Sequence, residues 1–393
     1  MNVLHYCSSL RLELGGVARA VLDLAVRTAE RGHRVVIASP EAQDVPAEWP
    51  RSAEGGERVP SLVELPAPAA RLGRFTGAQM AECLTPLISA ADIVHLHTPW
   101  DLSNLSLAGR CVRSGTPYVV SAHGMLDDWS MAQRSLKKRV FHFLFARRLL
   151  ERSAFVHCTA QAEFDQARKW FGSGRGEVAP LLFDLAPFRE LPGPGLAEGA
   201  YGLAAGGPPI VLFLSRLHYK KGPDVMLDAA GLLRDRGIEA LTVFAGTGEP
   251  DYERQLRAQA KRLGLGEDRV RFVGMVSGDE KVSLYERAQV FALPTSQENF
   301  GFVFPEALAC NTPVITTRGV DTWPELEGSG GSVIVERSPE AFADAIAQLL
   351  TDADRAVAMG RSGRAWVMKT FDADAIGARY ESLYQSAISC VQK

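Results

Sequence analysis

Two glutamates lie on either side of a glycine in residues 290–316, which read VFALPTSQENFGFVFPEALACNTPVIT. Carboxylates accept hydrogen bonds from hydroxyls, so Glu298 and Glu306, with seven residues between them, suit ligand rings that carry vicinal diols. A helix that begins at Pro305 would leave amides around Gly301 and Phe302 free for phosphate oxygens, and the glycine permits a close approach of the backbone. The stretch therefore predicts a site for a diphosphate between a ribose and a sugar.

Two cations are expected beside the end of another strand. The apolar residues 210–215 predict a buried strand with Arg216 at its carboxyl end, and Lys221 follows five residues later. Gly222-Pro223 then predicts the start of a helix. Ligands of open parallel sheets bind at the carboxyl ends of strands, so both cations are candidates for holding the diphosphate. An exposed basic cluster without a ligand would show the same pattern.

These motifs are similar to those of the retaining enzymes of glycosyltransferase family 4. Residues 290–316 resemble the Glu-x7-Glu motif of that family, and SRLHYKKG resembles its GRL...KG pattern. The resemblance implies that Glu298 contacts the donor sugar and that Glu306 holds the ribose hydroxyls. It also implies that Arg216 and Lys221 bind the diphosphate.

The sequence departs from the family pattern at three positions near these motifs. Ser215, Asn299 and Asn311 stand where glycines are common in the family. Asparagine tolerates a positive φ better than most residues, so the change at Asn311 need not disturb its turn. Without a ligand, the two glutamates would be solvated charges near the positive end of a helix.

Histidines follow two predicted strands in the first half of the chain, DIVHLH at residues 92–97 and YVVSAH at residues 118–123. His97 and His123 are expected at strand ends, where substrate groups would be met, whereas His95 inside its strand is expected to serve packing. These three histidines would need a fourth ligand to bind zinc, and their spacing indicates none, so no metal site is expected. The resemblance implies that His123 lies near the reacting sugar and that Gly16 belongs to the family's first glycine loop.

Residues 134–152, from Arg134 to Arg152, combine seven basic residues with apolar residues at helical spacing. This pattern is typical of a helix that packs its apolar stripe in the core. It also fits a helix on a membrane surface, because anionic headgroups attract such cations and the stripe can enter lipid. In that case the protein would contact the membrane peripherally, and the acceptor could be lipid-linked.

The elements that would position these residues predict an α/β fold. The opening reads as strand, glycine loop, helix and strand, and later strands alternate with helices in both halves. The chain of 393 residues is too long for one ordinary core. We expect two Rossmann-like doubly wound parallel-sheet domains facing a cleft, at residues 1–183 and 184–370. Residues 371–393 are expected to form a helix that crosses back to the first domain.

Composition limits the partners and the compartment. The net charge of −3 argues against a nucleic-acid-binding protein, and the six cysteines lack CxxC spacing, as expected of reduced core residues in the cytoplasm. We expect residues 40–75 and 191–207 to be irregular connections, and we expect neither a signal peptide nor a membrane span.

The combined motifs predict transfer of a sugar from a UDP- or GDP-sugar to a hydroxyl of a glycan or lipid-linked acceptor, in surface polysaccharide or glycoconjugate synthesis. No cofactor or metal is expected, because the nucleotide sugar is itself the substrate. The resemblance implies retention of the anomeric configuration. A nucleotide-sugar epimerase on the same fold and a catalytically silent nucleotide-sugar-binding protein are the alternatives.

Overall fold

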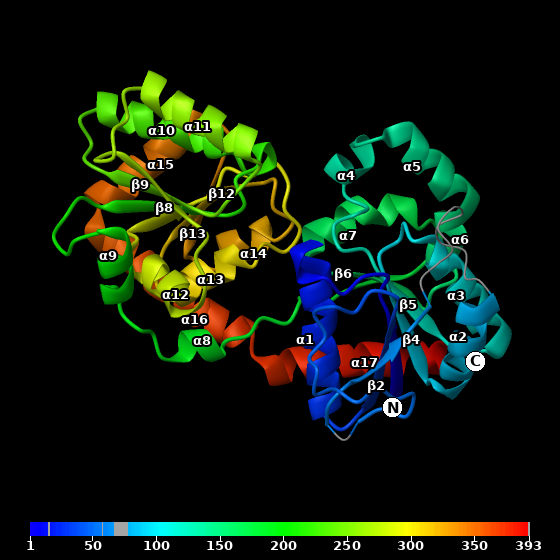
Figure 1. Ribbon diagram of the computed structural model, residues 1–393. Helices are drawn as coiled ribbons and strands as arrows, with labels where there is room; N and C mark the ends of the chain where they lie inside the picture. Colours follow the sequence, from blue (N-terminus) through cyan, green and yellow to red (C-terminus); the bar gives the residue numbers. More distant parts are fainter. Residues whose placement is uncertain (15, 57, 67–77, 392–393) are drawn as a thin grey trace. The chain divides into compact units, whose positions relative to one another are not determined.

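The computed structural model describes residues 1–14, 16–56, 58–66 and 78–391, which divide into two compact units (Figure 1). The first unit is Met1–Phe183 with Ala373–Lys393, and the second is Asp184–Asp372. Each unit is a parallel sheet between layers of helices. The predicted class of two Rossmann-like α/β domains is confirmed.

The first unit has a seven-stranded sheet in the order β3-β2-β1-β4-β5-β6-β7, with every neighbouring pair parallel. Its strands are β1 (Asn2–Tyr6), β2 (Arg34–Ser39), β3 (Ser61–Glu64), β4 (Ile93–His97), β5 (Tyr118–Ser121), β6 (Phe155–Cys158) and β7 (Gly176–Val178). Its α-helices are α1 (Gly16–Glu30), α2 (Ala78–Ala90), α3 (Leu102–Ser114), α4 (Asp128–Ala132), α5 (Ser135–Phe141), α6 (Arg147–Glu151), α7 (Gln161–Ala167) and α17 (Ala373–Val391), with the π-helical turn η2 (His142–Ala146) between α5 and α6.

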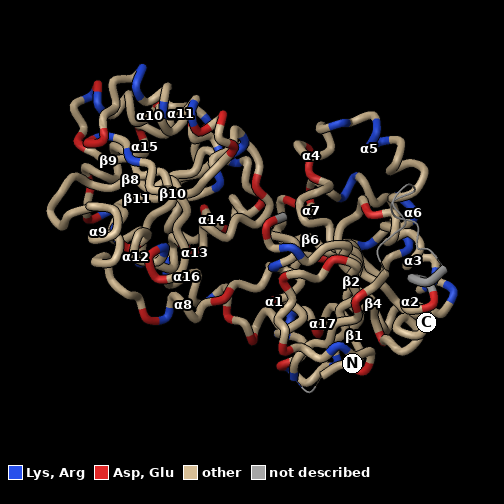
Figure 2. Tube along the Cα trace, in the orientation of Figure 1, with Lys and Arg blue, Asp and Glu red and all other residues tan. Residues whose placement is uncertain are grey.

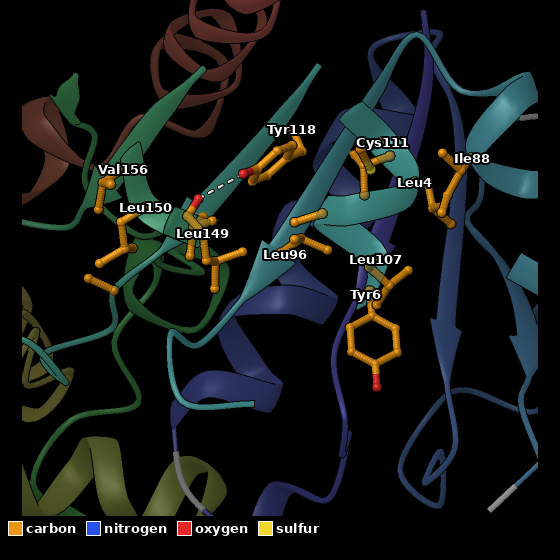
Figure 3. Close-up of a cluster of buried hydrophobic side chains, with 14 of the residues drawn as sticks. Leu4, Tyr6, Ile88, Leu96, Leu107, Cys111, Tyr118, Leu149, Leu150 and Val156 are labelled. Atoms are coloured by element: carbon orange, nitrogen blue, oxygen red, sulfur yellow. Dashed lines mark hydrogen bonds between the residues drawn. The ribbon is translucent and has the colours of Figure 1, made fainter. Parts of the chain in front are cut away.

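The two faces of this sheet differ in chemistry, because successive side chains of a strand point to opposite sides. One face is apolar and packs with α2, α3 and α6 around Leu4, Leu96, Leu107 and Tyr118 (Figure 3). The Tyr118 hydroxyl donates to the Leu149 carbonyl at 2.8 Å, so the polar end of the ring is satisfied inside the core. The opposite face carries buried histidines.

Helix α17 covers that second face together with α1, as predicted for the last helix of the chain. Tyr380 and Tyr384 of its apolar stripe are buried. Ionic contacts join α17 to the residues around the end of α1 in the first unit. Glu381 accepts a hydrogen bond from Arg31 Nη2 and lies 2.6 Å from His33 Nε2. The helix therefore completes the first unit, although it follows the second unit along the chain.

The second unit has a six-stranded parallel sheet in the order β10-β9-β8-β11-β12-β13. Its strands are β8 (Ile210–Leu214), β9 (Leu241–Ala245), β10 (Val270–Gly274), β11 (Val290–Ala292), β12 (Val314–Thr317) and β13 (Ser332–Val335). Its α-helices are α8 (Ala186–Arg189), α9 (Gly195–Tyr201), α10 (Pro223–Asp235), α11 (Pro250–Arg262), α12 (Gly278–Arg287), α13 (Val303–Ala309), α14 (Trp323–Gly328), α15 (Pro339–Thr351) and α16 (Ala353–Thr370). Every residue of β8 and β9 is buried, which explains why these two central strands read as unbroken apolar runs.

Two predicted connections contain regular structure instead. Within residues 40–75, β3 adds an edge strand to the first sheet, and residues 67–75 lie outside the described part of the chain. Within residues 191–207, α9 packs on α12, and Ala197 N–H donates to Ser283 Oγ at 3.0 Å. The expectation of core cysteines holds for four of the six, whereas Cys83 and Cys390 are exposed.

The basic segment divides into a buried and an exposed part. Leu149 and Leu150 of α6 are buried, as the core interpretation predicts. That interpretation is wrong for the residues before them, because Val140, Phe143, Leu144 and Phe145 are exposed. Lys and Arg lie along the same helices (Figure 2). Within the part of the chain that the structure describes, we find no helix both long and apolar enough to cross a bilayer.

Candidate functional site

Arg216 and Lys221 follow the carboxyl end of β8, as the sequence predicts. Arg216 is exposed in the turn after the strand, and Lys221 ends the short 3-10 helix η4 (Tyr219–Lys221). The Lys221 side chain is only 14% exposed, and its ammonium group is in direct contact with the carboxylate of Glu298. The fold thus brings together a cation and an acid that are far apart in sequence.

The surroundings of Lys221 disfavour the charged form of its side chain. The pKa of Lys221 is lowered to about 7, chiefly by burial and in addition by the nearby cations Lys220 and Arg216. The carboxylate of Glu298 opposes this effect, since an adjacent negative charge favours the ammonium form. A second anion at this place would stabilise three crowded cations at once.

Close backbone packing sets the position of Lys221. Gly222 has φ +74°, and a Cβ there would lie 2.4 Å from the carbonyl oxygen of Pro294. The Ser296 N–H donates to the Lys220 carbonyl at 2.8 Å, which joins the Lys221 segment to the loop that carries Glu298. A side chain at Gly222 would separate these two segments.

The loop of Glu298 is held from its other side by residues after β12. The Glu298 N–H donates to the Gly319 carbonyl at 2.8 Å, and the Asp321 N–H donates to the Glu298 carbonyl at 2.9 Å. Gly301 has φ +67°, and a Cβ there would lie 2.5 Å from the Phe304 ring. The residue at position 301 must therefore be glycine for the loop to pack against Phe304, and its approach to a ligand stays a prediction.

The helix after this loop begins two residues earlier than predicted. Phe302 is the N-cap residue and α13 starts at Val303, so Pro305 occupies the third helical position instead of the first. The shift has no energetic penalty, because the first N–H groups of a helix have no intrahelical partner for proline to lose. The start of this seven-residue helix remains beside Glu298 and Gly301.

Glu306 is already held by two side chains that the motif analysis missed. Lys281 Nζ donates to its Oε1 at 2.7 Å, and the Tyr285 hydroxyl donates to its Oε2 at 3.0 Å. Each carboxylate oxygen keeps a further lone pair for a ligand hydroxyl. Lys281 and Tyr285 stand four residues apart in α12, so the spacing that places them on one helix face was visible in the sequence.

A cavity of about 530 Å³ opens at the carboxyl ends of β8 and β9. Its lining includes Arg216 and His218 after β8, Gly246 and Glu249 after β9, and Met275 after β10. Polar groups, glycine backbone and an exposed methionine thus surround a space beside Arg216. The cavity is of the size that a bound small molecule requires.

The predicted residues of the first half belong to the first unit. His97 ends β4 and is buried, and Asn104 Nδ2 donates to its carbonyl at 3.0 Å. His123 follows β5 in a left-handed turn with φ +50°, an uncommon conformation for a residue other than glycine. Glu163 braces that turn by accepting from the Gly124 N–H at 2.6 Å. Gly16 is exposed at the start of α1, and its neighbour at position 15 lies outside the described residues.

His95 is buried inside β4 as predicted, but it belongs to a polar network. Its Nδ1 lies 2.8 Å from the Tyr384 hydroxyl and its Nε2 lies 2.6 Å from Ser121 Oγ. Nitrogens of His5, His95 and His97 lie within 4.8 Å of one another, so these residues are the candidate metal ligands of the described part of the chain. Both nitrogens of His95 are engaged by hydroxyls, so ligation by it would break one of these hydrogen bonds.

The two halves of the chain match two family models. Residues 14–186 match "Glycosyltransferase Family 4", and residues 202–366 match "Glycosyl transferases group 1". A GDP-mannose-dependent alpha-(1-6)-phosphatidylinositol monomannoside mannosyltransferase of Mycobacterium tuberculosis is 31% identical over 93% of this chain and 93% of its own length. The chain belongs to glycosyltransferase family 4.

A further relative and two solved structures also match this glycosyltransferase over most of its length. A D-inositol 3-phosphate glycosyltransferase of Corynebacterium jeikeium is 33% identical over 82% of this chain and 79% of its own length. Among solved structures, HepE of Anabaena in complex with UDP has a TM-score of 0.79 at 19% identity, over 98% of this chain and 100% of its own. WaaG, a glycosyltransferase involved in lipopolysaccharide biosynthesis, has a TM-score of 0.70 at 18% identity, over 97% and 99%. These structures share the fold of this glycosyltransferase.

Proposed function

We propose that the enzyme transfers a sugar from a nucleotide-diphosphate sugar to a hydroxyl group of an acceptor. The observation that carries the proposal is the buried ammonium of Lys221, which lies among other cations at the carboxyl end of β8 and against the carboxylate of Glu298. Cations crowded around Arg216, which itself lines the cavity, are suited to a ligand with more than one negative charge, such as a diphosphate.

The residues of the second unit take the following roles in this proposal. Arg216, Lys221 and the amides of Gly301 and Phe302 hold the diphosphate. Glu306, oriented by its bonds to Lys281 and Tyr285, accepts hydrogen bonds from the ribose hydroxyls, and Glu298 contacts the donor sugar. His123 of the first unit bonds a sugar hydroxyl. The site needs no metal in this scheme, because protein cations balance the diphosphate charge.

The proposed chemistry retains the anomeric configuration. The bond between the anomeric carbon and the diphosphate oxygen breaks, and Arg216 and Lys221 stabilise the charge that develops on the departing phosphate. The acceptor oxygen forms the new bond to the anomeric carbon on the same face, and its proton passes to the phosphate oxygen that leaves. NMR of the product tests this step, and an inverted anomeric centre would refute it.

The donor is tested with purified protein and a panel of UDP- and GDP-sugars. GDP-mannose comes first, because the name of the Mycobacterium tuberculosis relative contains it. A specific donor should raise the unfolding temperature, since a ligand that binds the folded state stabilises it by mass action. Glu306→Ala should lose this shift, whereas Glu340→Ala, at an exposed position of α15, should keep it. A shift that survives Glu306→Ala, or an isomerised donor formed without acceptor, would overturn the proposal.

We also propose that the acceptor is lipid-linked and that the segment from α5 to α6 contacts an anionic membrane. Leu136 and Phe143 are 77% and 75% exposed, among Lys137, Arg139 and Arg147 on the same helices. Apolar side chains flanked by cations suit lipid tails below anionic headgroups, with about 1 kcal/mol from each cation near the surface. The relative from Mycobacterium tuberculosis is named for a phosphatidylinositol-based acceptor.

Sedimentation with vesicles tests the membrane contact. The wild type should sediment with vesicles of phosphatidylcholine and phosphatidylglycerol but not with phosphatidylcholine alone. Leu136→Ser combined with Phe143→Ser should reduce the bound fraction several-fold, because both side chains lose their apolar surface. Val357→Ser, at an exposed apolar position of α16 in the second unit, is the matched control and should bind as the wild type does. Equal binding of all three proteins would refute the contact.

A further inference from the structure

A row of polar side chains runs across the α17 face of the first sheet. His5 of β1 is the register partner of His95 of β4, His97 is the partner of Ser121 of β5, and Ser121 is the partner of His157 of β6. All five side chains are buried. Apolar residues would fill this layer without any need for hydrogen-bond partners, so four buried histidines on one face of the sheet call for a reason beyond packing.

One group of these residues forms a hydrogen-bonded chain whose direction is fixed at one end. His157 Nε2 lies 2.8 Å from the Ala179 carbonyl, which can only accept, so this nitrogen carries the proton. His157 Nδ1 is therefore bare and accepts from Ser121, 2.7 Å away. Ser121 then accepts from His95 Nε2, and the Tyr384 hydroxyl donates to His95 Nδ1. Every nitrogen of this group has a partner.

A second group leads from the buried His5 to His123 in the turn after β5. His5 Nδ1 lies 3.1 Å from His97 Nε2, and His97 Nδ1 lies 3.1 Å from His123 Nε2. His5 and His97 are buried, and a buried charge without a paired opposite charge is costly, so both rings are neutral. Each neutral ring has one N–H and one bare nitrogen, so the two hydrogen bonds must point the same way along the chain.

The environment of His5, at the inner end of this second group, decides in which direction the three histidines donate their hydrogen bonds. His5 Nε2 is buried and has no hydrogen-bond partner among the described residues. A buried acceptor without a partner is tolerated more often than a buried N–H without one. His5 Nε2 is therefore the bare nitrogen, so that His5 donates from Nδ1 to His97 and His97 donates from Nδ1 to His123 Nε2. His123 is then left with its proton on Nδ1.

We propose that His97, backed by His5, is a positioning residue that fixes the tautomer of His123 so that its free nitrogen is a hydrogen-bond donor. His123 Nε2 is committed to His97, and Nδ1–H is offered to a ligand oxygen such as that of a sugar hydroxyl. The brace from Glu163 to Gly124 keeps the left-handed turn that aims the ring. His123 accordingly binds an oxygen by donation and does not act as a general base. This inference rests on the proposed contact of His123 with substrate.

Histidine tautomers are read directly by two-bond 1H–15N correlation NMR on protein with 15N-labelled histidine, which needs no substrate. We expect His123 and His97 in the Nδ1–H form at about pH 7. His97→Phe removes the donor and keeps a ring, so His123 should lose its fixed Nδ1–H form. His97→Asn retains an N–H near the position of Nδ1 and should restore that form. Ser121→Ala, which interrupts only the other group, is the matched control and should leave the His123 signal unchanged.

Kinetics complete the test. His97→Phe should lower kcat/KM by about 3- to 10-fold, the worth of one neutral hydrogen bond, and His97→Asn should recover most of the loss. Nucleotide affinity in the second unit should stay constant in both variants. An Nε2–H or doubly protonated His123 in the wild type overturns the inference. If the NMR result holds but wild-type protein transfers no sugar, the proposed function fails and the tautomer assignment stands.

Discussion

Replacement of Lys221 by methionine tests the site most directly, because the substitution removes the charge and keeps an unbranched side chain of similar length. A unit charge about 4 Å from a phosphate oxygen contributes about 4 kcal/mol at an effective dielectric constant of about 20. Lys221 is 14% exposed, so solvent screening is incomplete, and we take about 2–4 kcal/mol as the loss. This corresponds to a decrease of about 30- to 1,000-fold in kcat/KM.

Two measurements separate the contributions to this loss. Calorimetric titration with the nucleotide gives the part present in the ground state, and kcat/KM gives the whole effect. Lys221→Met leaves Glu298 without its cation, so the double variant Lys221→Met, Glu298→Gln shows whether an uncompensated carboxylate causes the loss. We expect the double variant to stay impaired.

The control for net charge is Lys261→Met, at an exposed position in the last turn of α11. This variant should bind the nucleotide and turn over as the wild type does. Lys221→Met with less than about a 3-fold change in both nucleotide affinity and kcat/KM would refute the assignment, because a cation in contact with the diphosphate must be worth more than that.

Three further predictions concern pH, the ribose and α17. A bound diphosphate should raise the pKa of Lys221 from about 7. Nucleotide-sugar affinity should therefore be constant below about pH 7 and fall by up to about tenfold per pH unit above it. Calorimetric titrations in two buffers should show proton uptake on binding, and Lys221→Arg should remove the pH dependence. Glu306→Gln should weaken nucleotide binding by about 10- to 100-fold. A 2′,3′-dideoxy nucleotide should bind to the wild type and the variant with equal affinity. If the variant also loses about 10- to 100-fold in affinity for the dideoxy nucleotide, Glu306 does not contact the ribose. The hydrogen bond from Arg31 holds the pKa of Glu381 below its usual value. The ionised carboxylate therefore adds to the free energy of unfolding at pH values above the ordinary pKa of glutamate. This contribution is lost as the pH falls through the lowered pKa of the folded state. Glu381→Gln should therefore reduce stability by about 1 kcal/mol near neutral pH and by little in acid, measured by thermal unfolding; an equal loss at both pH values would disprove the linkage.

The sequence predicted best where one local pattern decides the structure. Central strands such as β8 and β9 are buried on both faces, so unbroken apolar runs marked them. Gly222-Pro223 marked the start of α10, because glycine supplies a left-handed conformation and proline fits the first helical position. Whether Arg216, Lys221, Glu298 and Glu306 bind a nucleotide sugar stays a prediction.

Long-range contacts account for what the sequence did not predict. Pairing with β2 makes residues 61–64 a strand, and no feature of Ser61–Glu64 alone announces that partner. The pair of Lys281 and Glu306 joins α12 to α13, and the partners of His97 come from β1 and from the turn after β5. Motif analysis found His97 and His123 but missed His5 and His157, because only the sheet register brings them together.

The return of α17 to the first unit sets the order of events during synthesis. The ribosome makes residues 184–372 before it delivers the helix that seals the histidine face. At about 5–20 residues per second, that interval lasts roughly 10–40 s. Throughout it, the nascent first unit presents an unfinished surface to water. Imidazole and hydroxyl groups can hydrogen-bond to water during this interval, so this face is less apolar than the opposite face of the sheet while α17 is still unsynthesised.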